Sequence, residues 1–318
     1  MEPLIIISGP TAAGKTDISV KLAKKINGEI ISADSMQVYK GMDIGSAKIS
    51  AQEMQGVKHH LIDILDPFDE FNAALFKEYA LEAIKDIRSR GHIPIVVGGT
   101  GFYIQGLLYD VDFDKSRGDI PKIREKLEED LKTHGNLYLY ERLKAVDPES
   151  AEIIHSNNVK RMIRALEFYE ETGEKLSAHN DKMHQNISPY NFAYFVLTFD
   201  RQKLYERIDA RVDKMINDGL VSEVKALKDK GLSRANTSML GIGYKEILDH
   251  LDGKYSFEEA VDIIKKETRH FAKRQMTWFR REKEVIFIDK DEYEDDEAIL
   301  EYMLNVLNER KIVLWPKA

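Results

Sequence analysis

The sequence predicts an α/β protein in which helices cover a parallel sheet and an all-helical segment is inserted into this core. Two observations support this fold class. Short apolar runs alternate with helical patterns over the first third of the chain, whereas residues 112–190 show helical patterns only. The length of 318 residues, set against about 100–200 residues per domain, leaves room for a core and one insertion.

Strands and helices alternate from the start of the chain. Apolar runs at residues 4–8, 29–32 and 93–97 predict three strands. Apolar residues at helical spacing predict one helix just after Lys15 and another from about Asn72. Because strands that alternate with helices usually run parallel, the first part of the chain is expected to form a parallel sheet.

The same alternation returns after the helical segment. Alternating apolar residues predict a strand at 191–198, and Asp200 is placed to cap a long helix. Residues 256–259 read Ser-Phe-Glu-Glu, a capping box that opens another helix, and residues 285–288 predict a last strand before a closing helix. These elements are expected to complete the core that the N-terminal part begins.

The chain is therefore expected to form two domains. Residues 1–111 and 191–318 form the α/β core, and residues 112–190 form the inserted helical domain.

Composition and charge exclude several classes of protein. The absence of cysteine excludes disulfides, Cys-ligated metal centres and thiol catalysis. The formal net charge of −8 argues against a histone-like, nonspecific nucleic-acid binder. No apolar run approaches the ~20 residues that span a bilayer, and the N-terminus does not resemble a signal peptide. We expect a cytoplasmic protein with no membrane association, monomeric by default, with no obligate protein partner.

Residues 9–16 read Gly-Pro-Thr-Ala-Ala-Gly-Lys-Thr and match the phosphate-binding motif G-x-x-x-x-G-K-[ST] between a predicted strand and a predicted helix. In such a loop the backbone N–H groups and the helix N-terminus face a polyphosphate. Lys15 then reaches the outer phosphate, and the Thr16 hydroxyl can hold Mg²⁺. The motif predicts a core similar to that of P-loop NTPases, with Mg²⁺ as the cofactor.

A carboxylate that such enzymes usually need is missing here. P-loop kinases and NTPases place an acidic residue on the magnesium from the end of a second core strand. The strand at 93–97 instead continues into Gly98-Gly-Thr-Gly101. Asp34 follows the strand at 29–32, where open parallel sheets contact their ligands, and it can ligate a metal or accept a proton. The alternative is a turn aspartate that bonds its own backbone.

Ordered motifs over nearly the whole chain resemble those of the tRNA dimethylallyltransferase (tRNA isopentenyltransferase) family. They lie at residues 9–16, 34–48, 59–63, 97–103, 161–167, 243–245 and 268–280. The resemblance implies transfer of a dimethylallyl group from dimethylallyl diphosphate to the N6 amine of the adenosine 3′ of the anticodon in tRNA, with Mg²⁺. A prenyl diphosphate offers its two phosphates to the loop with no γ-phosphate to cleave, which would account for the missing carboxylate.

The resemblance also implies roles for single residues. The loop would bind the diphosphate through Gly9, Pro10, Thr11, Ala12, Ala13, Gly14, Lys15 and Thr16. Lys15, Arg211 and Thr16, with its Mg²⁺, would neutralise the leaving diphosphate. Arg207 lies four residues before Arg211 on the same helix face, and a solvated surface is the alternative for both. Asp34 matches the catalytic aspartate, and a base that takes the amine proton contributes roughly a hundredfold or more.

Contacts with tRNA are implied in the same way. The inserted helices would bind the anticodon stem-loop, and the target base would be extruded and held by its edges. The matching positions are Asp34, Ser35, Met36, Gln37, Thr100, Gly101, Lys160, Arg161, Arg164, Tyr244, Lys245 and Arg274. Thr100 has an alternative role as the cap of the following helix.

Residues 262–283 form the most basic stretch of the chain. Eight Lys and Arg residues oppose three acidic ones, which gives a net charge of +5, and aromatic residues interleave with the charges. This mixture is typical of segments that contact phosphates and bases. The alternative is a helix with one basic face and an aromatic face in the core. The adjacent His59 and His60 suggest a metal site only weakly, and a structural role in a loop is favoured.

Two other functions fit parts of this sequence. A small-molecule or nucleoside kinase would use ATP at the same loop, but it would need the strand-end carboxylate that is missing. A noncatalytic RNA-binding protein could keep the diphosphate pocket as a switch. Replacement of Asp34 by alanine separates the prenyltransferase from this binding protein: in the enzyme tRNA binding survives while transfer collapses, whereas the binding protein has no transfer activity to lose.

Overall fold

The computed structural model describes residues 1–111 and 120–313, and in two of its helices the side chains of 120–121 and 183–185 are also outside the description. The chain forms two compact units. One comprises Met1–Leu107 together with Pro189–Ala318, and the other comprises Leu108–Ser188. The predicted insertion at 112–190 overlaps the second unit, although its residues 112–119 lie outside the described range.

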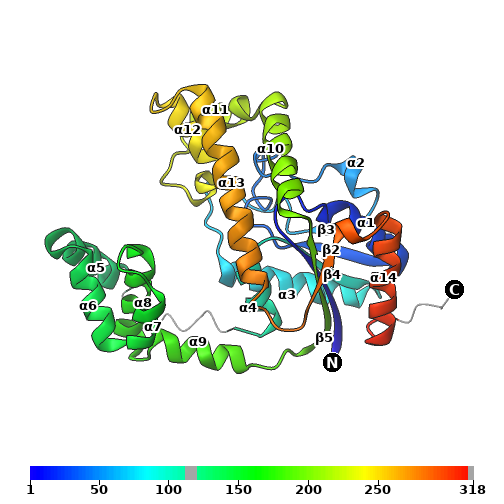
Figure 1. Cartoon of the computed structure of the whole chain (residues 1–318), viewed down its shortest axis with the longest axis horizontal. Coiled ribbons are helices and arrows are strands. Elements are labelled where there is room, and N and C mark those ends of the chain that lie inside the picture. The colour runs from blue at the N-terminus through cyan, green and yellow to red at the C-terminus, as the bar shows by residue number, and fades with distance from the viewer. Residues whose placement is uncertain (112–119, 314–318) are drawn as a thin grey trace. The chain divides into compact units, whose positions relative to one another are not determined.

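The first unit is built of strands and helices, which alternate over its N-terminal part as the sequence predicted (Figure 1). Its N-terminal elements are β1 (Glu2–Ser8), α1 (Lys15–Ile26), β2 (Gly28–Ser32), α2 (Ala51–Met54), β3 (His59–His60), α3 (Ala73–Ser89), β4 (Ile93–Gly98) and α4 (Gly101–Leu108). Its C-terminal elements are β5 (Tyr190–Thr198), α10 (Arg201–Asn217), α11 (Leu220–Asp229), η1 (Thr237–Leu240), α12 (Tyr244–Leu251), α13 (Phe257–Phe279), β6 (Val285–Asp289), η2 (Lys290–Glu292) and α14 (Asp296–Glu309).

The described residues contain a six-stranded sheet in the order β3-β2-β4-β1-β5-β6. Every pair of neighbouring strands in it is parallel, which confirms the predicted α/β class. In the central strand β1, Ile6 lies between Val96 of β4 and Tyr194 of β5. All three side chains are fully buried, because helices cover a parallel sheet on both faces.

The core packs around α1 and α14 on one side of this sheet. Ile18 and Leu22 of α1 and Ile299 and Met303 of α14 belong to one buried cluster with side chains of β1 and β5. The spacing of three and four residues within each helix gives the apolar stripe that predicted these helices. This packing fixes the start of α1, and with it the loop of residues 9–16.

Helices α10 and α13 begin where their caps predicted. The Asp200 carboxylate accepts hydrogen bonds from the backbone N–H groups of Gln202 and Lys203, and Ser256 and Glu259 form the capping box of α13. The capping satisfies backbone donors that a helix start leaves without intrahelical partners.

Two ion pairs join α10 to α13. Lys265 Nζ lies 2.6 Å from Asp213 Oδ1, and Arg269 Nη1 lies 2.5 Å from Asp209 Oδ1. These two cations of the basic stretch 262–283 therefore hold the two helices together. They are structural rather than exposed contacts for a phosphate.

The second unit is helical throughout its described residues. Its elements are α5 (Ile120–His134), α6 (Asn136–Val146), α7 (Pro148–Ile153), α8 (Val159–Thr172) and α9 (Leu176–Gln185). Leu127, Leu143 and Met162 belong to its own buried core. The buried carboxylate of Asp147 accepts hydrogen bonds from Ser150 and Ser177, which ties the start of α9 to α7. None of the described helices of the chain is long and apolar enough to cross a membrane.

Candidate active site

The phosphate-binding motif folds as the loop between β1 and α1. Gly9 and Gly14 have φ angles of 144° and 76°, which favour glycine. A Cβ atom on Gly9 would lie 2.5 Å from the carbonyl oxygen of Leu197, so β5 also leaves no room for a side chain there. The loop ends at Gly14, and α1 begins at Lys15, so the N-terminus of a twelve-residue helix faces the loop. This arrangement is suited to an anion.

Lys15 lies over this loop. Its Nζ atom donates hydrogen bonds to the carbonyl oxygens of Gly9 at 3.0 Å and Pro10 at 2.8 Å. Burial, helped by the nearby Arg211, lowers the pKa of Lys15 to about 7, although Asp34 opposes both effects. Because a bound anion stabilises the ammonium form, this lysine is poised to gain a proton when a diphosphate arrives.

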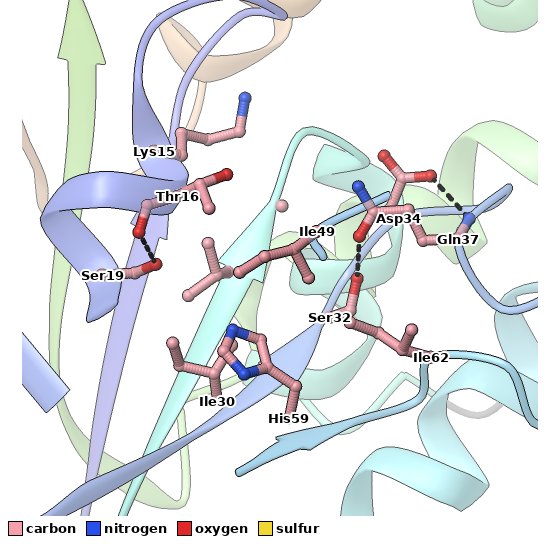
Figure 2. A pocket seen from close by; sticks show the side chains of 12 residues that line it. Lys15, Thr16, Ser19, Ile30, Ser32, Asp34, Gln37, Ile49, His59 and Ile62 are labelled. Carbon is pink, nitrogen blue, oxygen red and sulfur yellow. Dashed lines mark hydrogen bonds between the residues drawn. The ribbon is translucent and has the colours of Figure 1, made fainter. Parts of the chain in front are cut away.

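A small cavity of about 60 Å³ lies beside the loop. Figure 2 shows the Thr16 hydroxyl pointing into it from α1, opposite Asp34 and Gln37, with His59 below. The remaining described lining residues are Lys15, Ser19, Ile30, Ser32, Ile49, Ile62, Val97 and Gly98.

The lining of this cavity includes oxygen donors of the kind that Mg²⁺ takes. Mg²⁺ keeps several waters and commonly takes only one or two protein ligands besides substrate phosphates. The Thr16 hydroxyl supplies one such ligand at the edge of the loop, as Figure 2 shows. In the described residues no group of three or more His, Asp or Glu side chains forms a complete protein cage for a metal, so the ion would depend on the bound phosphates.

A larger cavity of about 470 Å³ opens on the other side of Asp34. It gathers predicted residues from segments far apart in the sequence, namely Thr11, Lys15, Asp34, Ser35, Met36, Thr100, Arg211, Lys245 and Arg274. Among the described lining residues, Lys15 and Asp34 line both cavities. The carboxylate thus lies at the boundary between the phosphate-binding loop and a cavity large enough for a second substrate.

The Asp34 carboxylate forms the turn that the sequence left open as an alternative. Its Oδ1 atom accepts hydrogen bonds from the backbone N–H groups of Met36 at 2.8 Å and Gln37 at 3.2 Å. The turn interpretation is therefore confirmed. In Figure 2 the other carboxylate oxygen points away from the backbone nitrogen of Gln37. The turn holds the side chain through Oδ1, and the second oxygen takes no part in these two hydrogen bonds.

Arg207 and Arg211, both on α10, have different partners. Arg211 lines the large cavity, where burial lowers its pKa and Asp34 counteracts that effect. Arg207 instead donates a hydrogen bond from Nε to the carbonyl oxygen of Ala12 at 2.9 Å and stacks over the ring of Phe199. Arg207 therefore supports the phosphate loop, while Arg211 is the arginine that faces the site.

The missing carboxylate at the end of β4 has a steric cause. A Cβ atom on Gly98 would lie only 2.1 Å from the carbonyl oxygen of Ala33, just before Asp34. No side chain of any kind fits at this position, so β4 cannot present an acidic residue there. Close approach of the two strand ends places Asp34 where the site needs a carboxylate.

Gln275 is a site residue that the sequence did not single out. Its Oε1 atom accepts a hydrogen bond from Thr11 N at 3.0 Å, and its Nε2 atom donates one to Gly99 O at 2.9 Å. The buried side chain thus joins α13 to the phosphate loop and to the segment after β4. Gln275 lies within the motif at 268–280, but only the tertiary structure shows that it bridges two loops.

Glu223 of α11 was also missed. Its carboxylate accepts hydrogen bonds from three consecutive backbone N–H groups, those of residues 43–45, at 2.8 to 3.1 Å. It accepts a fourth from the Tyr244 hydroxyl at 2.7 Å. Gly45 and Ser46 line the large cavity, so this carboxylate fixes part of the cavity wall.

Tyr244 is corrected by this geometry. Its side chain is 0% exposed, and its hydroxyl is bonded to Glu223, so the ring supports the wall from behind and does not present a surface to RNA. The neighbouring Lys245 does line the large cavity. Gly101 begins α4 and packs so closely that a Cβ atom would lie 2.2 Å from the Trp278 ring.

The predicted residues of the second unit lie on α8. Lys160, Arg161 and Arg164 are all exposed, and Asn158 caps the start of this helix through the backbone N–H of Arg161. They form part of a basic surface within the inserted unit.

The two adjacent histidines form a strand, which corrects the predicted loop. Residues 59–60 constitute β3 and pair with Ile30 and Ile31 of β2. His60 Nε2 lies 2.7 Å from the buried Glu29 carboxylate, which Arg90 also contacts. No metal is needed to explain this cluster, because the histidine and the arginine partner the buried charge.

Comparisons with known proteins show the family of this chain. The family model for IPP transferase matches residues 37–282, and the model for isopentenyl transferase matches residues 2–67. The chain is 55% identical to the tRNA dimethylallyltransferase of Lachnoclostridium phytofermentans over 313 residues, which cover 98% of this chain and 100% of the relative. The enzyme of the same name from Acetivibrio thermocellus is 50% identical over 94% of this chain and 96% of its own length.

Solved structures show the same likeness. The full-length tRNA isopentenylpyrophosphate transferase from Bacillus halodurans is 44% identical, with a TM-score of 0.73 over 98% of both chains. A eukaryotic dimethylallyltransferase acting on tRNA is 30% identical, with a TM-score of 0.81 over 100% of this chain and 81% of that one. The chain, a transferase, therefore belongs to the tRNA dimethylallyltransferase family.

Proposed function

We propose that the protein transfers a dimethylallyl group from dimethylallyl diphosphate to the N6 amine of the adenosine 3′ of the anticodon in tRNA. The main observation behind this proposal is that Lys15 and Asp34 line both the small cavity beside the phosphate loop and the large cavity. A donor with a charged end and an acceptor base therefore have separate seats that meet at one carboxylate.

The donor is seated by its diphosphate. The backbone of residues 9–16, the start of α1 and Lys15 supply the positive potential that a diphosphate requires. When bound beside Thr16, Mg²⁺ supplies further neutralisation of charge on the phosphate oxygens. Because no γ-phosphate is cleaved, this seat needs no carboxylate at the end of β4. The close contact between Gly98 and Ala33 leaves no room for one there, which is consistent with a prenyl diphosphate as the donor.

The acceptor is an adenine extruded into the large cavity. Its exocyclic nitrogen attacks the allylic carbon, a C–N bond forms, and the C–O bond to diphosphate breaks. Asp34 takes the proton from the amine, while Arg211 and Lys15 stabilise the charge that develops on the departing diphosphate. Ser35, Met36 and Thr100 line the same cavity and are placed to contact the base.

The same proposal assigns contacts to the rest of the tRNA. The anticodon stem-loop is bound through the exposed cations of α8 in the inserted unit, and Lys245 and Arg274 contact it at the large cavity. Because tRNA is found in the cytoplasm, an enzyme with this substrate is expected to act there. Neither substrate demands a protein partner.

One incubation tests this function. The protein is mixed with dimethylallyl diphosphate, Mg²⁺ and unmodified tRNA, and the nucleosides are then analysed by mass spectrometry. The proposal expects one adenosine per tRNA to gain a dimethylallyl group, and none in a tRNA whose adenosine 3′ of the anticodon is replaced by guanosine. A parallel incubation with ATP and nucleoside acceptors should yield no phosphorylated product. Phosphoryl transfer without prenyl transfer would support the kinase instead.

A further inference from the structure

A buried carboxylate links two exposed arginines in the inserted unit. Glu167 of α8 is only 1% exposed. Its Oε1 atom lies 3.3 Å from Arg124 Nε of α5, and its Oε2 atom lies 3.3 Å from Arg164 Nη1 of α8. The side chains of Arg124 and Arg164 are 52% and 56% exposed. One oxygen of the carboxylate therefore faces each guanidinium from beneath.

The charge balance of this triad is positive. A buried carboxylate requires partners, because the free energy cost of removing it from water is several kcal/mol. Two arginines share Glu167: Arg164 donates a hydrogen bond to Oε2, whereas Oε1 has the ion-pair contact with Arg124 and no hydrogen bond. Each guanidinium carries five N–H donors, and the ion pair with Glu167 occupies only one side of each. Donors of both arginines remain on the exposed side.

A second triad in the same unit shows the opposite balance. Arg142 lies between Asp130 and Glu170, so two carboxylates share one cation. All three of these side chains are largely buried, about a quarter exposed each. That arrangement carries a net negative charge, which does not favour an anion. The contrast indicates that the excess of positive charge around Glu167 is specific to its face of the unit.

We propose that Arg124 and Arg164 form a seat for one backbone phosphate of RNA, and that Glu167 is the positioning residue that orients both guanidinium groups toward it. Arginine pairs suit phosphate because their planar forks donate parallel hydrogen bonds. Lys160 lies one turn before Arg164 on the same helix and adds positive charge. This proposal depends on the proposed function, and RNA is favoured over an acidic peptide because tRNA is the proposed substrate.

Salt dependence tests the seat directly. Binding of tRNA to the full chain is measured across a series of salt concentrations for the wild type and for Arg124→Gln, Arg164→Gln and the double variant. Each single change should reduce the slope of log K against log salt by about 0.7 to 0.9, the value for one lost phosphate contact. If both arginines grip the same phosphate, the double variant should reduce the slope by no more than a single variant.

A matched control removes a cation elsewhere. Lys182 of α9 is 74% exposed and paired with Glu174, and Lys182→Gln should leave the slope unchanged. Slopes of the arginine variants that equal the wild type or this control would overturn the seat. An equal loss of affinity for poly-glutamate would identify an acidic-peptide site and would also overturn the assignment to RNA.

Glu167→Gln separates orientation from charge. The change adds one positive charge to the unit, so an effect of net charge alone would tighten tRNA binding. The proposal expects binding to weaken severalfold, because the guanidinium groups lose their shared anchor. Arg142→Gln, which breaks two ion pairs elsewhere in the same unit, should lower the melting temperature without changing tRNA affinity. Tighter or unchanged binding by Glu167→Gln would show that Glu167 is structural only.

The wild-type incubation keeps the two proposals distinct. If the wild type modifies tRNA but the arginine variants keep the normal slope, only the phosphate seat is wrong. If the wild type neither binds nor modifies tRNA, the proposed function is wrong and the seat is wrong with it.

Discussion

Gln275 and Thr11 are joined by a hydrogen bond of 3.0 Å in which the Gln275 side chain accepts from the Thr11 backbone N–H. The bond spans most of the chain and connects α13 with the phosphate loop. The same side chain donates to Gly99 O, so one residue fixes the relative positions of the loop after β1 and the loop after β4.

Gln275→Ala should therefore weaken donor binding. Loss of two buried hydrogen bonds is expected to lower the free energy of unfolding by about 1–3 kcal/mol. The less restrained loop should raise the KM for dimethylallyl diphosphate about tenfold, a loss of about 1.4 kcal/mol of binding. Steady-state kinetics and urea unfolding measure both effects. Thr277→Ala, on the exposed face of the same helix, is the control, and an equal KM in both variants would contradict the bridging role.

Diphosphate binding should take up a proton at Lys15. Burial holds the pKa of this lysine at about 7, so above pH 7 it is largely neutral, and a bound anion raises the pKa again. Affinity for diphosphate should thus fall as the pH rises from 7 to 9. Calorimetry in buffers of different ionisation enthalpy measures the proton uptake. Lys15→Met should bind with less uptake, and identical uptake in both proteins would show that the proton goes elsewhere.

Glu29 should make part of the stability depend on acid pH. The hydrogen bond with Arg90, helped by His60, lowers the pKa of Glu29 from 4.5 to about 2. Because the folded state holds this proton less tightly than the unfolded state, the stabilisation is complete above pH 4.5 and is lost as the pH falls toward 2. Between pH 5 and pH 3 the loss should be about 2 kcal/mol.

Glu29→Gln measures this effect in urea unfolding. The difference in unfolding free energy between wild type and variant should be largest near pH 6 and should shrink at pH 3. Glu82→Gln, at an exposed position of α3, should give a difference that does not depend on pH. A constant difference for Glu29→Gln would contradict the role of the network around β2 and β3.

Tyr244→Phe tests the correction made to that residue. The change removes the hydroxyl that donates to Glu223 and leaves the buried ring in place. We expect about 1–2 kcal/mol of destabilisation and a tRNA Kd within twofold of the wild type. Lys245→Gln should instead weaken tRNA binding with little effect on the melting temperature. A large loss of tRNA affinity in Tyr244→Phe would restore the tyrosine as an RNA contact.

Local signals were sufficient for most of the sheet and its helices. The apolar runs, the Asp200 cap and the Ser256 capping box each report on backbone bonds within a few residues, and the structure has the corresponding elements. The edge strand β3 was missed because two histidines do not look like a strand. These histidines form a strand because they pair with β2 and because His60 contacts the buried Glu29 carboxylate.

The site was predictable where the motif itself makes the geometry. The conformation of the loop at residues 9–16 depends on its glycines, and the position of Lys15 follows from the motif itself. Gln275 and Glu223 could not be predicted, because each binds a backbone segment at least 170 residues away in sequence. The role of Gly98 was equally hidden, since its importance lies in the closeness of Ala33 and not in any side chain.

The proposed role of Asp34 as the base is tested most directly by a single-turnover measurement. Wild type and Asp34→Asn are saturated with tRNA and dimethylallyl diphosphate, and the rate of product formation is recorded. Asparagine can still accept from Met36 and Gln37, so the turn and tRNA affinity should persist while the rate falls at least a hundredfold. A rate within a fewfold of the wild type, with intact tRNA binding, would contradict the role of Asp34 as the base.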